Sequence, residues 1–208
     1  MKRKPRVGGG RQRDAGLRGQ PAAVTAPFDP AALRALAEER RPDHLRLRRQ
    51  LKDGIVSEAR ADALFHRFYG EVHATIDCTA CANCCVEQSP TLNPRDVRRL
   101  AKALGMTAPD FTRSYLGASE EEPNALVFAQ RPCPFLTTRR CSQYEARPDA
   151  CRGYPHLHHK DMVGRLWAVV SNAEVCPIVY EVLERLHEAL AAEASDDFND
   201  GDPDLVEY

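Results

Sequence analysis

The feature that most constrains this chain is the crowding of its cysteines into one segment. All eight lie between Cys78 and Cys176, whereas residues 1–77 contain none. Four of them fall in one short run, Cys78-x2-Cys81-x2-Cys84-Cys85. A C-x-x-C turn brings two sulfur atoms to one side of a tight loop, and two such turns in series supply three ligands for one metal centre. The run therefore predicts a metal-binding segment.

The adjacent cysteines Cys84 and Cys85 are expected to serve different sites, because the side chains of neighbouring residues usually diverge. The remaining cysteines follow at irregular spacings, at Cys133, Cys141, Cys151 and Cys176. We expect all eight to ligate metal as two sets of four. One set would take three cysteines from the run and one later cysteine, and the other would take one from the run and three later ones, although the sequence does not assign the members. Two alternatives stay open: some cysteines are buried as small hydrophobic side chains, or one C-x-x-C pair is a redox dithiol.

Other side chains near the cysteines are weaker candidates. His156, His158 and His159 carry imidazoles, which bind zinc and iron well, but an exposed polar loop is the interpretation we favour. Arg147 and Arg152 are expected either to offset the charge of a multi-thiolate site or to be ordinary arginines at a helix end.

Charge and hydropathy exclude several classes of protein. The longest apolar run is about five residues, at 166–170, so no membrane-spanning helix and no secretory signal are predicted. A cytoplasmic, reducing compartment is expected, where cysteines serve as ligands rather than as disulfides. The net charge is +6 over 1–27, zero over 28–191 and -7 over 192–208. The neutral middle does not predict nucleic-acid binding, and the charged tails are the expected route to any protein partner.

Composition divides the chain into four parts. Residues 1–27 are rich in Gly, Arg, Ala and Pro and are predicted to be a disordered basic tail. A helical segment at 28–77 is expected to pack on a cysteine-cluster domain at 78–193, and the acidic residues 194–208 are predicted to be disordered. The predicted fold is mainly α, with short strands and irregular loops, in a small domain that metal stabilises.

Capping residues predict where the helices begin and end. Helices are expected over 30–42, 43–52, 57–76, 93–105, 107–117 and 177–194. The first boundary rests on Pro42, because a proline inside a helix removes a hydrogen bond and clashes with the preceding turn. Apolar stretches at 124–130 and 166–171 predict short strands.

Taken together, these motifs resemble the CxxCxxCC family of zinc- or iron-chelating proteins, also called cysteine-cluster proteins. The resemblance covers about 78–177, and its elements are Cys78-Thr-Ala-Cys81-Ala-Asn-Cys84-Cys85, Leu92-Asn-Pro94-Arg-Asp96-Val97, Cys133-Pro134-Phe135-Leu136, Cys141-x2-Tyr144-x2-Arg147-Pro148-x2-Cys151-Arg152-x-Tyr154-Pro155 and Cys176-Pro177. One position departs from the pattern, since Ala82 stands where many members carry glycine. If that position needs a positive φ, alanine adds strain there but removes no ligand.

The resemblance implies a cytoplasmic chelating protein with an iron–sulfur cluster or iron as its cofactor, zinc as the alternative, and metal ions as its partners. Flagellin lysine methylases carry a related cysteine cluster, thought in them to be an iron–sulfur centre. A metal- or iron–sulfur-dependent protein-modifying or redox enzyme is therefore the second hypothesis. The chain has no dinucleotide-binding, P-loop or G-x-S-x-G motif, so no catalytic residue is assigned.

Overall fold

The computed structural model describes residues 29–120 and 122–199. This part of the chain is mostly helical, with a few short antiparallel strands, which confirms the predicted fold class. The predicted basic tail at 1–27 and residues 200–208 of the predicted acidic tail lie outside the described residues. No helix in the described part of the chain combines the length and the apolar character that a membrane span requires.

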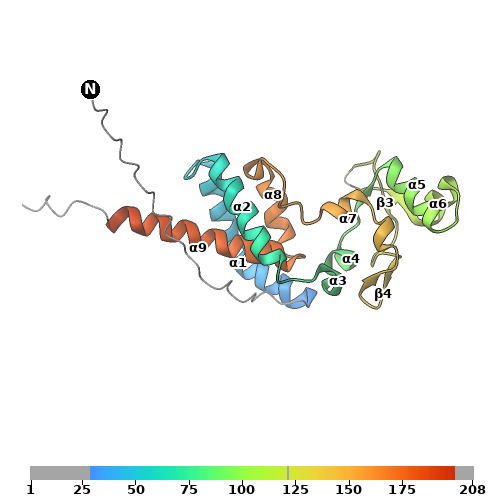
Figure 1. The fold of residues 1–208 in the computed structure, drawn as a ribbon, viewed down its shortest axis with the longest axis horizontal. Coiled ribbons are helices and arrows are strands. Elements are labelled where there is room, and N and C mark those ends of the chain that lie inside the picture. Colours follow the sequence, from blue (N-terminus) through green and yellow to red (C-terminus); the bar gives the residue numbers. More distant parts are fainter. Residues whose placement is uncertain (1–28, 121, 200–208) are drawn as a thin grey trace, which may run out of the picture.

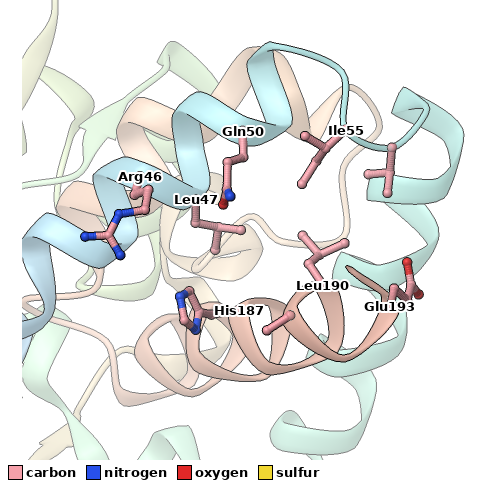
Figure 2. Close-up of a pocket in the computed structure, with 9 residues that line it drawn as sticks. Arg46, Leu47, Gln50, Ile55, His187, Leu190 and Glu193 are labelled. Carbon is pink, nitrogen blue, oxygen red and sulfur yellow. The ribbon is translucent and has the colours of Figure 1, made fainter. Parts of the chain in front are cut away.

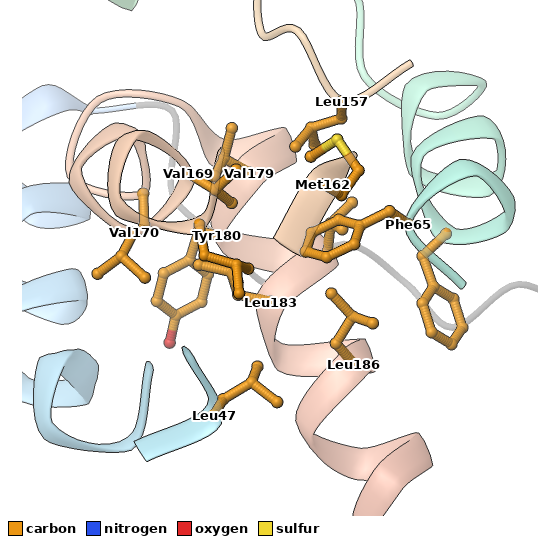
Figure 3. Close-up of a cluster of buried hydrophobic side chains, with 14 of the residues drawn as sticks. Leu47, Phe65, Leu157, Met162, Val169, Val170, Val179, Tyr180, Leu183 and Leu186 are labelled. Atoms are coloured by element: carbon orange, nitrogen blue, oxygen red, sulfur yellow. The ribbon is translucent and has the colours of Figure 1, made fainter. Parts of the chain in front are cut away.

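Four long helices form one lobe, which we call the helical lobe (Figure 1). They are α1 (Pro30–Lys52), α2 (Glu58–His73), α8 (Met162–Asn172) and α9 (Pro177–Asn199). Leucine and other large apolar side chains recur every three or four residues on each helix, so that one face of each is buried. Figure 3 shows Leu47, Phe65, Met162, Leu183 and Leu186 in the resulting core. The helical lobe therefore combines two helices of the predicted segment 28–77 with two helices from the C-terminal part of the chain.

The expectation that the first helix ends near Pro42 is wrong, because α1 continues through Pro42 to Lys52. Contacts with α9 hold both sides of the proline. Arg40 lies 2.9 Å from the carboxylate of Glu184, and His44 Nε2 lies 2.8 Å from the same carboxylate. Packing against α9 therefore outweighs the local preference of proline to end a helix.

The strand predicted at 166–171 is also wrong, because these residues lie inside α8. Asp161 caps this helix by accepting a hydrogen bond from Gly164 N at 3.2 Å. Leu166, Val169 and Val170 are buried in the core of the helical lobe. A short apolar run fits a buried helix as well as a strand, and the cap and the packing decide between them.

A second lobe, which we call the strand lobe, forms a smaller core. Its helices are α5 (Pro94–Ala103) and α6 (Ala108–Tyr115), which begin at the predicted caps Asn93 and Thr107. Its antiparallel sheet has the order β1-β3-β2, from β1 (Thr91–Leu92), β3 (Leu126–Phe128) and β2 (Leu116–Ala118). The strand expected at 124–130 is thus confirmed as β3. Phe111, Phe128 and Phe135 fill the core, with ring centroids 5.6 Å apart for Phe128 and Phe135.

Short elements occupy the junction of the lobes. They are α3 (Cys78–Cys81), α4 (Asn83–Glu87), β4 (Leu136–Thr137), β5 (Arg140–Cys141), the 3-10 helix η1 (Tyr144–Ala146) and α7 (Asp149–Gly153). Figure 1 shows α3 and α4 between the two lobes. Two polar contacts tie α4 and the residue after it to the helical lobe: Arg34 pairs with Glu87 at 2.6 Å, and Gln88 Nε2 donates to Asn172 Oδ1 at 2.9 Å. All eight cysteines lie in or beside these elements.

Helix α9 begins at the predicted Pro177 and reaches Asn199. It therefore runs past Ala194, where the helix was expected to end and the predicted acidic tail to begin. Its first residues lie beside Cys176, so this helix connects the cysteine sites to the core of the helical lobe.

Candidate metal centre

The C-x-x-C-x-x-C-C run folds as two short helical turns joined at Ala82. Asp77 caps the first turn by accepting a hydrogen bond from Thr79 N at 2.8 Å. Ala82 then adopts a left-handed conformation, with φ 58 and ψ 8. This confirms that the position needs a positive φ, which costs alanine roughly 1–2 kcal/mol. The left-handed residue turns the chain so that α4 starts at Asn83 and carries Cys84 and Cys85 back toward the junction.

One set of four cysteines, which we call site A, lines a small cavity where α3 and α4 meet the start of α9. Its members are Cys78, Cys81, Cys84 and Cys176. The cavity has a volume of about 30 Å³, and Ile76, Ile178 and the ring of Tyr154 also line it. Site A therefore takes three ligand candidates from the sequence motif and one from a residue 92 positions after Cys84.

Site A is not arranged as the ligand set of a single ion. Four thiolates around one zinc ion, at about 2.3 Å from it, lie about 3.8 Å from one another and leave no room for a water-sized sphere. The site A cysteines instead border a cavity that apolar side chains also line. In agreement, no three His, Cys, Asp or Glu side chains in the described part of the chain converge as ligands of one ion do.

Backbone N–H groups point at two of the site A sulfurs. Cys176 immediately precedes α9, and Ile178 and Val179 donate backbone hydrogen bonds to its thiol. Asn83 donates a backbone hydrogen bond to Cys81. Burial raises the pKa of Cys176 to about 12, and these donors at the helix N-terminus oppose that effect. The backbone N–H groups thus stabilise a negatively charged thiolate, whereas burial disfavours a thiolate that has no positive charge beside it.

A second set, which we call site B, brings Cys85 together with Cys133, Cys141 and Cys151. Burial raises the pKa of Cys151 to about 12, with further contributions from the charges of the other three. Cys85 and Cys133 are also joined by a backbone hydrogen bond of 2.8 Å from Cys133 N to the Cys85 carbonyl oxygen. The antiparallel pairing of β4 with β5 places Cys141 opposite Leu136, beside the Cys133 turn.

Site B shows the same pattern of backbone donors. Phe135 and Leu136 donate backbone hydrogen bonds to the Cys133 sulfur, and Gln143 donates one to Cys141. Burial raises the pKa of Cys133 to about 11 despite these donors. Turns whose N–H groups face a cysteine sulfur are suited to hold a thiolate that binds metal, because each bond offsets part of the negative charge.

The two sets meet at Cys84 and Cys85. The Cys84 thiol donates a hydrogen bond to the Cys85 sulfur, which lowers the pKa of Cys85 and, together with burial, raises that of Cys84. The charge of Cys85 raises the pKa of Cys81, and the charge of Cys151 raises the pKa of Cys84, so each set also acts on the other. Three cysteines of the run thus share a cavity with Cys176, and Cys85 lies near Cys133, Cys141 and Cys151. That each group ligates metal stays a prediction.

Two buried donors that the sequence did not single out face site A. Asn83 Nδ2 and the Tyr154 hydroxyl are buried and have no hydrogen-bond partner among the described residues, and both residues line the cavity. The amide oxygen of Asn83 accepts from Arg139 at 3.4 Å, so its NH₂ group is the end left over. A buried donor without a partner costs roughly 1–3 kcal/mol, whereas a charged sulfur centre would satisfy both.

The other candidates take different positions. Arg147 stacks on the ring of Tyr144, with its guanidinium carbon 3.7 Å from the ring centroid, and its charge opposes the raised pKa of Cys151 and Cys141. Arg152 instead donates to the backbone oxygens of Glu145 and Arg147. The three histidines gather on one loop after α7, in ring contact with one another but outside the cavity of site A.

A larger cavity lies away from both sites, between α1 and α9 (Figure 2). It has a volume of about 380 Å³, with Leu47, Ile55 and Leu190 among its apolar lining and Arg46 and Glu193 at its edge. None of its lining residues is a cysteine. The sulfur chemistry of the described residues is therefore confined to the junction of the lobes.

Comparison with known proteins gives one match. Residues 77–177 match a protein family named CxxCxxCC and described as a "putative zinc- or iron-chelating domain". The matched segment begins one residue before Cys78 and ends one residue after Cys176, so it contains all eight cysteines. No curated protein and no solved structure is similar enough to this chain to count as a match.

Proposed function

Residues 77–177 belong to the CxxCxxCC family of zinc- or iron-chelating domains, and we propose that this protein holds iron at two four-cysteine sites, with an iron–sulfur cluster at site A. Site A consists of Cys78, Cys81, Cys84 and Cys176, and site B of Cys85, Cys133, Cys141 and Cys151. All eight cysteines are free of disulfides, which supports a reducing compartment such as the cytoplasm.

The spacing of the site A cysteines is the observation that carries the proposal. Iron–sulfur clusters use C-x2-C-x2-C runs, with a fourth cysteine that comes from elsewhere in the chain and is followed by proline in the bacterial pattern. Here Cys78, Cys81 and Cys84 supply the run, and Cys176 is followed by Pro177. A 4Fe–4S cluster binds each cysteine through a different iron atom, so its ligands stand farther apart than those of a single ion. The same four cysteines line one cavity in the structure, which supports their assignment to one centre.

The surroundings of site A also fit a charged sulfur centre. Asn83 and Tyr154 line the cavity and carry buried donors that have no partner among the described residues, and Cys81 and Cys176 each accept at least one backbone N–H. Such donors stabilise coordinated thiolates and tune the reduction potential of a cluster. Bound iron would supply the positive charge that lets these buried cysteines ionise.

The positions of the ligands indicate a role in holding the lobes together. Cys176 belongs to the start of α9 in the helical lobe, whereas Cys133 and Cys141 pack against the core of the strand lobe. The run from Cys78 to Cys85 lies between them and contributes to both sites. Filling both sites would therefore fasten the two lobes through α3 and α4, and metal binding would contribute directly to folding.

The enzyme alternative, a protein-modifying or redox activity related to flagellin lysine methylase, rests on the family resemblance alone. We therefore propose chelation with a bound iron centre as the function and assign no catalytic residue.

The test is anaerobic purification of the full chain, followed by visible absorption spectroscopy and analysis of iron, zinc and acid-labile sulfide. We expect sulfur-to-iron charge-transfer absorption and stoichiometric sulfide. A colourless protein with stoichiometric zinc would overturn the iron–sulfur assignment and keep chelation. A folded protein that retains neither metal, and whose melting temperature does not respond to added metal, would overturn both.

A further inference from the structure

The loop between α7 and α8 gathers three imidazoles at a place that neither sulfur site uses. We propose that His156 and His159 bind one divalent transition-metal ion, of the class that prefers nitrogen ligands, at an exposed site separate from sites A and B. The ring centroids of these two residues lie 5.6 Å apart, with an angle of 21° between the ring planes. Both residues are half-buried, so part of each remains accessible to solvent.

The separation of the two rings suits a shared ion. A zinc–nitrogen bond of about 2.0–2.1 Å places the centre of each imidazole about 3 Å from the metal, so two ligands at a tetrahedral angle have centroids about 5 Å apart. The observed 5.6 Å is close to this separation, and binding would turn the two stacked rings so that one nitrogen of each faces the ion. Two imidazoles with solvent completing the coordination form an open site, which is consistent with the finding that no three potential ligands converge among the described residues.

Neighbouring rings hold the pair in position. His158 contacts His159 in a tilted arrangement with centroids 4.4 Å apart, and Tyr154 meets His156 edge-on at 6.0 Å. Tyr69 closes the other end of this row, 6.3 Å from His158. Burial raises the pKa of Tyr69, and the charges of Cys78 and Cys176 raise it further, so the row ends near site A. The proposed site thus lies next to the sulfur sites without sharing a ligand with them.

The backbone of the loop is also fixed. His66 on α2 bonds through Nε2 to the carbonyl oxygen of His159 at 2.7 Å, and Leu157 is fully buried in the core of the helical lobe. Asp62 accepts backbone hydrogen bonds from Asp161 and Met162, at 3.0 and 2.8 Å. The loop is therefore held at both ends of the His156–His159 segment.

His156 itself adopts a left-handed conformation, with φ 65. This conformation is unfavourable for a residue other than glycine, and it persists only where the surroundings hold it. Glycine at position 153 provides the space, because a Cβ atom there would lie 3.0 Å from the His156 ring. Gly153 therefore positions the imidazole.

The chemistry of the loop selects the kind of ion. Burial lowers the pKa of His156, and the neighbouring His159, His158 and Arg165 lower it further, so its ring is neutral and able to coordinate at pH 7. The positive charge of Arg165 acts on His156 and disfavours ions that are held by charge alone. Nitrogen donors beside a cation favour zinc, cobalt or copper over magnesium or calcium, which require oxygen ligands.

The test uses the untagged full chain, purified with its cysteine-bound metal, and equilibrium dialysis against Zn²⁺ at pH 7. We expect one additional zinc ion per chain, with unchanged iron and sulfide content. The double variant H156N/H159Q should weaken this binding at least ~10- to 100-fold. Asparagine tolerates the left-handed conformation, so the loop keeps its backbone. G153A should also weaken binding, because its methyl group displaces the His156 ring.

H187N is the matched control, because His187 is a half-buried histidine of α9 that lines the separate cavity of Figure 2. Its zinc binding should equal that of the unmodified chain. An unmodified chain that binds no additional zinc, or a double variant that binds it equally well, would overturn the inference. Because the ligands are distinct, a chain with no metal at its cysteines but with histidine-dependent zinc binding would refute only the proposed function.

Discussion

The thiol of Cys84 donates a hydrogen bond to the sulfur of Cys85, yet these neighbouring residues belong to different four-cysteine sets. Cys84 lines site A with Cys176, whereas the Cys85 carbonyl oxygen accepts the backbone N–H of Cys133 in site B. A single peptide unit therefore links the two proposed metal sites. A change in the position of one site is transmitted to the other through the shortest covalent connection that the chain offers.

The first prediction separates the two sites with adjacent substitutions. C84S should remove the metal of site A and leave that of site B, and C85S should do the reverse, because serine does not replace a thiolate ligand. Each variant should lose the iron of one site and keep that of the other, and only C84S should lose the acid-labile sulfide of site A. Metal analysis combined with the visible spectrum checks this, and each variant is the control for the other. Loss of all metal in both variants would instead indicate one shared centre.

The second prediction concerns the left-handed residue between α3 and α4. A82G should raise the free energy of unfolding by about 1 kcal/mol, because glycine adopts a φ of 58 without the steric cost that alanine carries. Urea denaturation of the metal-loaded protein measures the change. The control is A80G, which places glycine inside the helical turn of α3 and should destabilise by roughly 0.5–1 kcal/mol. Equal effects of both substitutions would contradict the strain at Ala82.

The third prediction tests the buried hydroxyl of Tyr154. In the metal-free protein, Y154F should raise the free energy of unfolding by about 1 kcal/mol, because it removes a buried donor that has no partner among the described residues. In the metal-loaded protein the same substitution should destabilise, because a donor to thiolate sulfur is lost. Thermal unfolding with and without metal measures the two signs. Y69F is the control, and a Y154F effect of one sign in both states would refute a hydrogen bond to the sulfur site.

The fourth prediction is a pH dependence in the helical lobe. Burial raises the pKa of Glu184, but hydrogen bonds from His44 and Arg40 outweigh burial and hold it below its usual value. Because the folded pKa is lowered, the carboxylate stabilises the fold above its unfolded pKa of about 4.3. This contribution is lost as the pH falls toward the lower folded value. E184Q should therefore destabilise by about 1–3 kcal/mol at pH 7, and the difference from the unmodified chain should shrink below about pH 4.

Urea denaturation at several pH values measures this difference, and effects common to both proteins, such as loss of metal in acid, cancel. E188Q on the same helix is the control, because Glu188 is exposed and should show no comparable difference at any pH. A difference between E184Q and the unmodified chain that stays constant from pH 7 to pH 3 would show that the ionisation of Glu184 is not responsible.

Local signals predicted the elements whose ends depend on local hydrogen bonds. Ser57, Asn93 and Thr107 cap their helices as expected, because a side-chain oxygen satisfies backbone N–H groups of the next turn whatever lies around it. Two of the errors, at Pro42 and at 166–171, fall where burial decides. Glu184 holds α1 together across the proline from 142 residues away, and the core of the helical lobe makes a helix of an apolar run.

The sequence by itself determined that the chain carries a metal-binding type of cysteine cluster, because the C-x-x-C spacing and the concentration of eight cysteines are properties of the chain alone. It also indicated that Cys84 and Cys85 serve different sites, and that Ala82 is strained if the turn requires a positive φ. Only the tertiary structure decided which distant cysteine joins which set. Cys176 reaches site A because α9 packs in the helical lobe, and Cys133 and Cys141 face site B because they pack against the core of the strand lobe. Cysteine sets assembled from both lobes depend on long-range packing, and no local spacing encodes that.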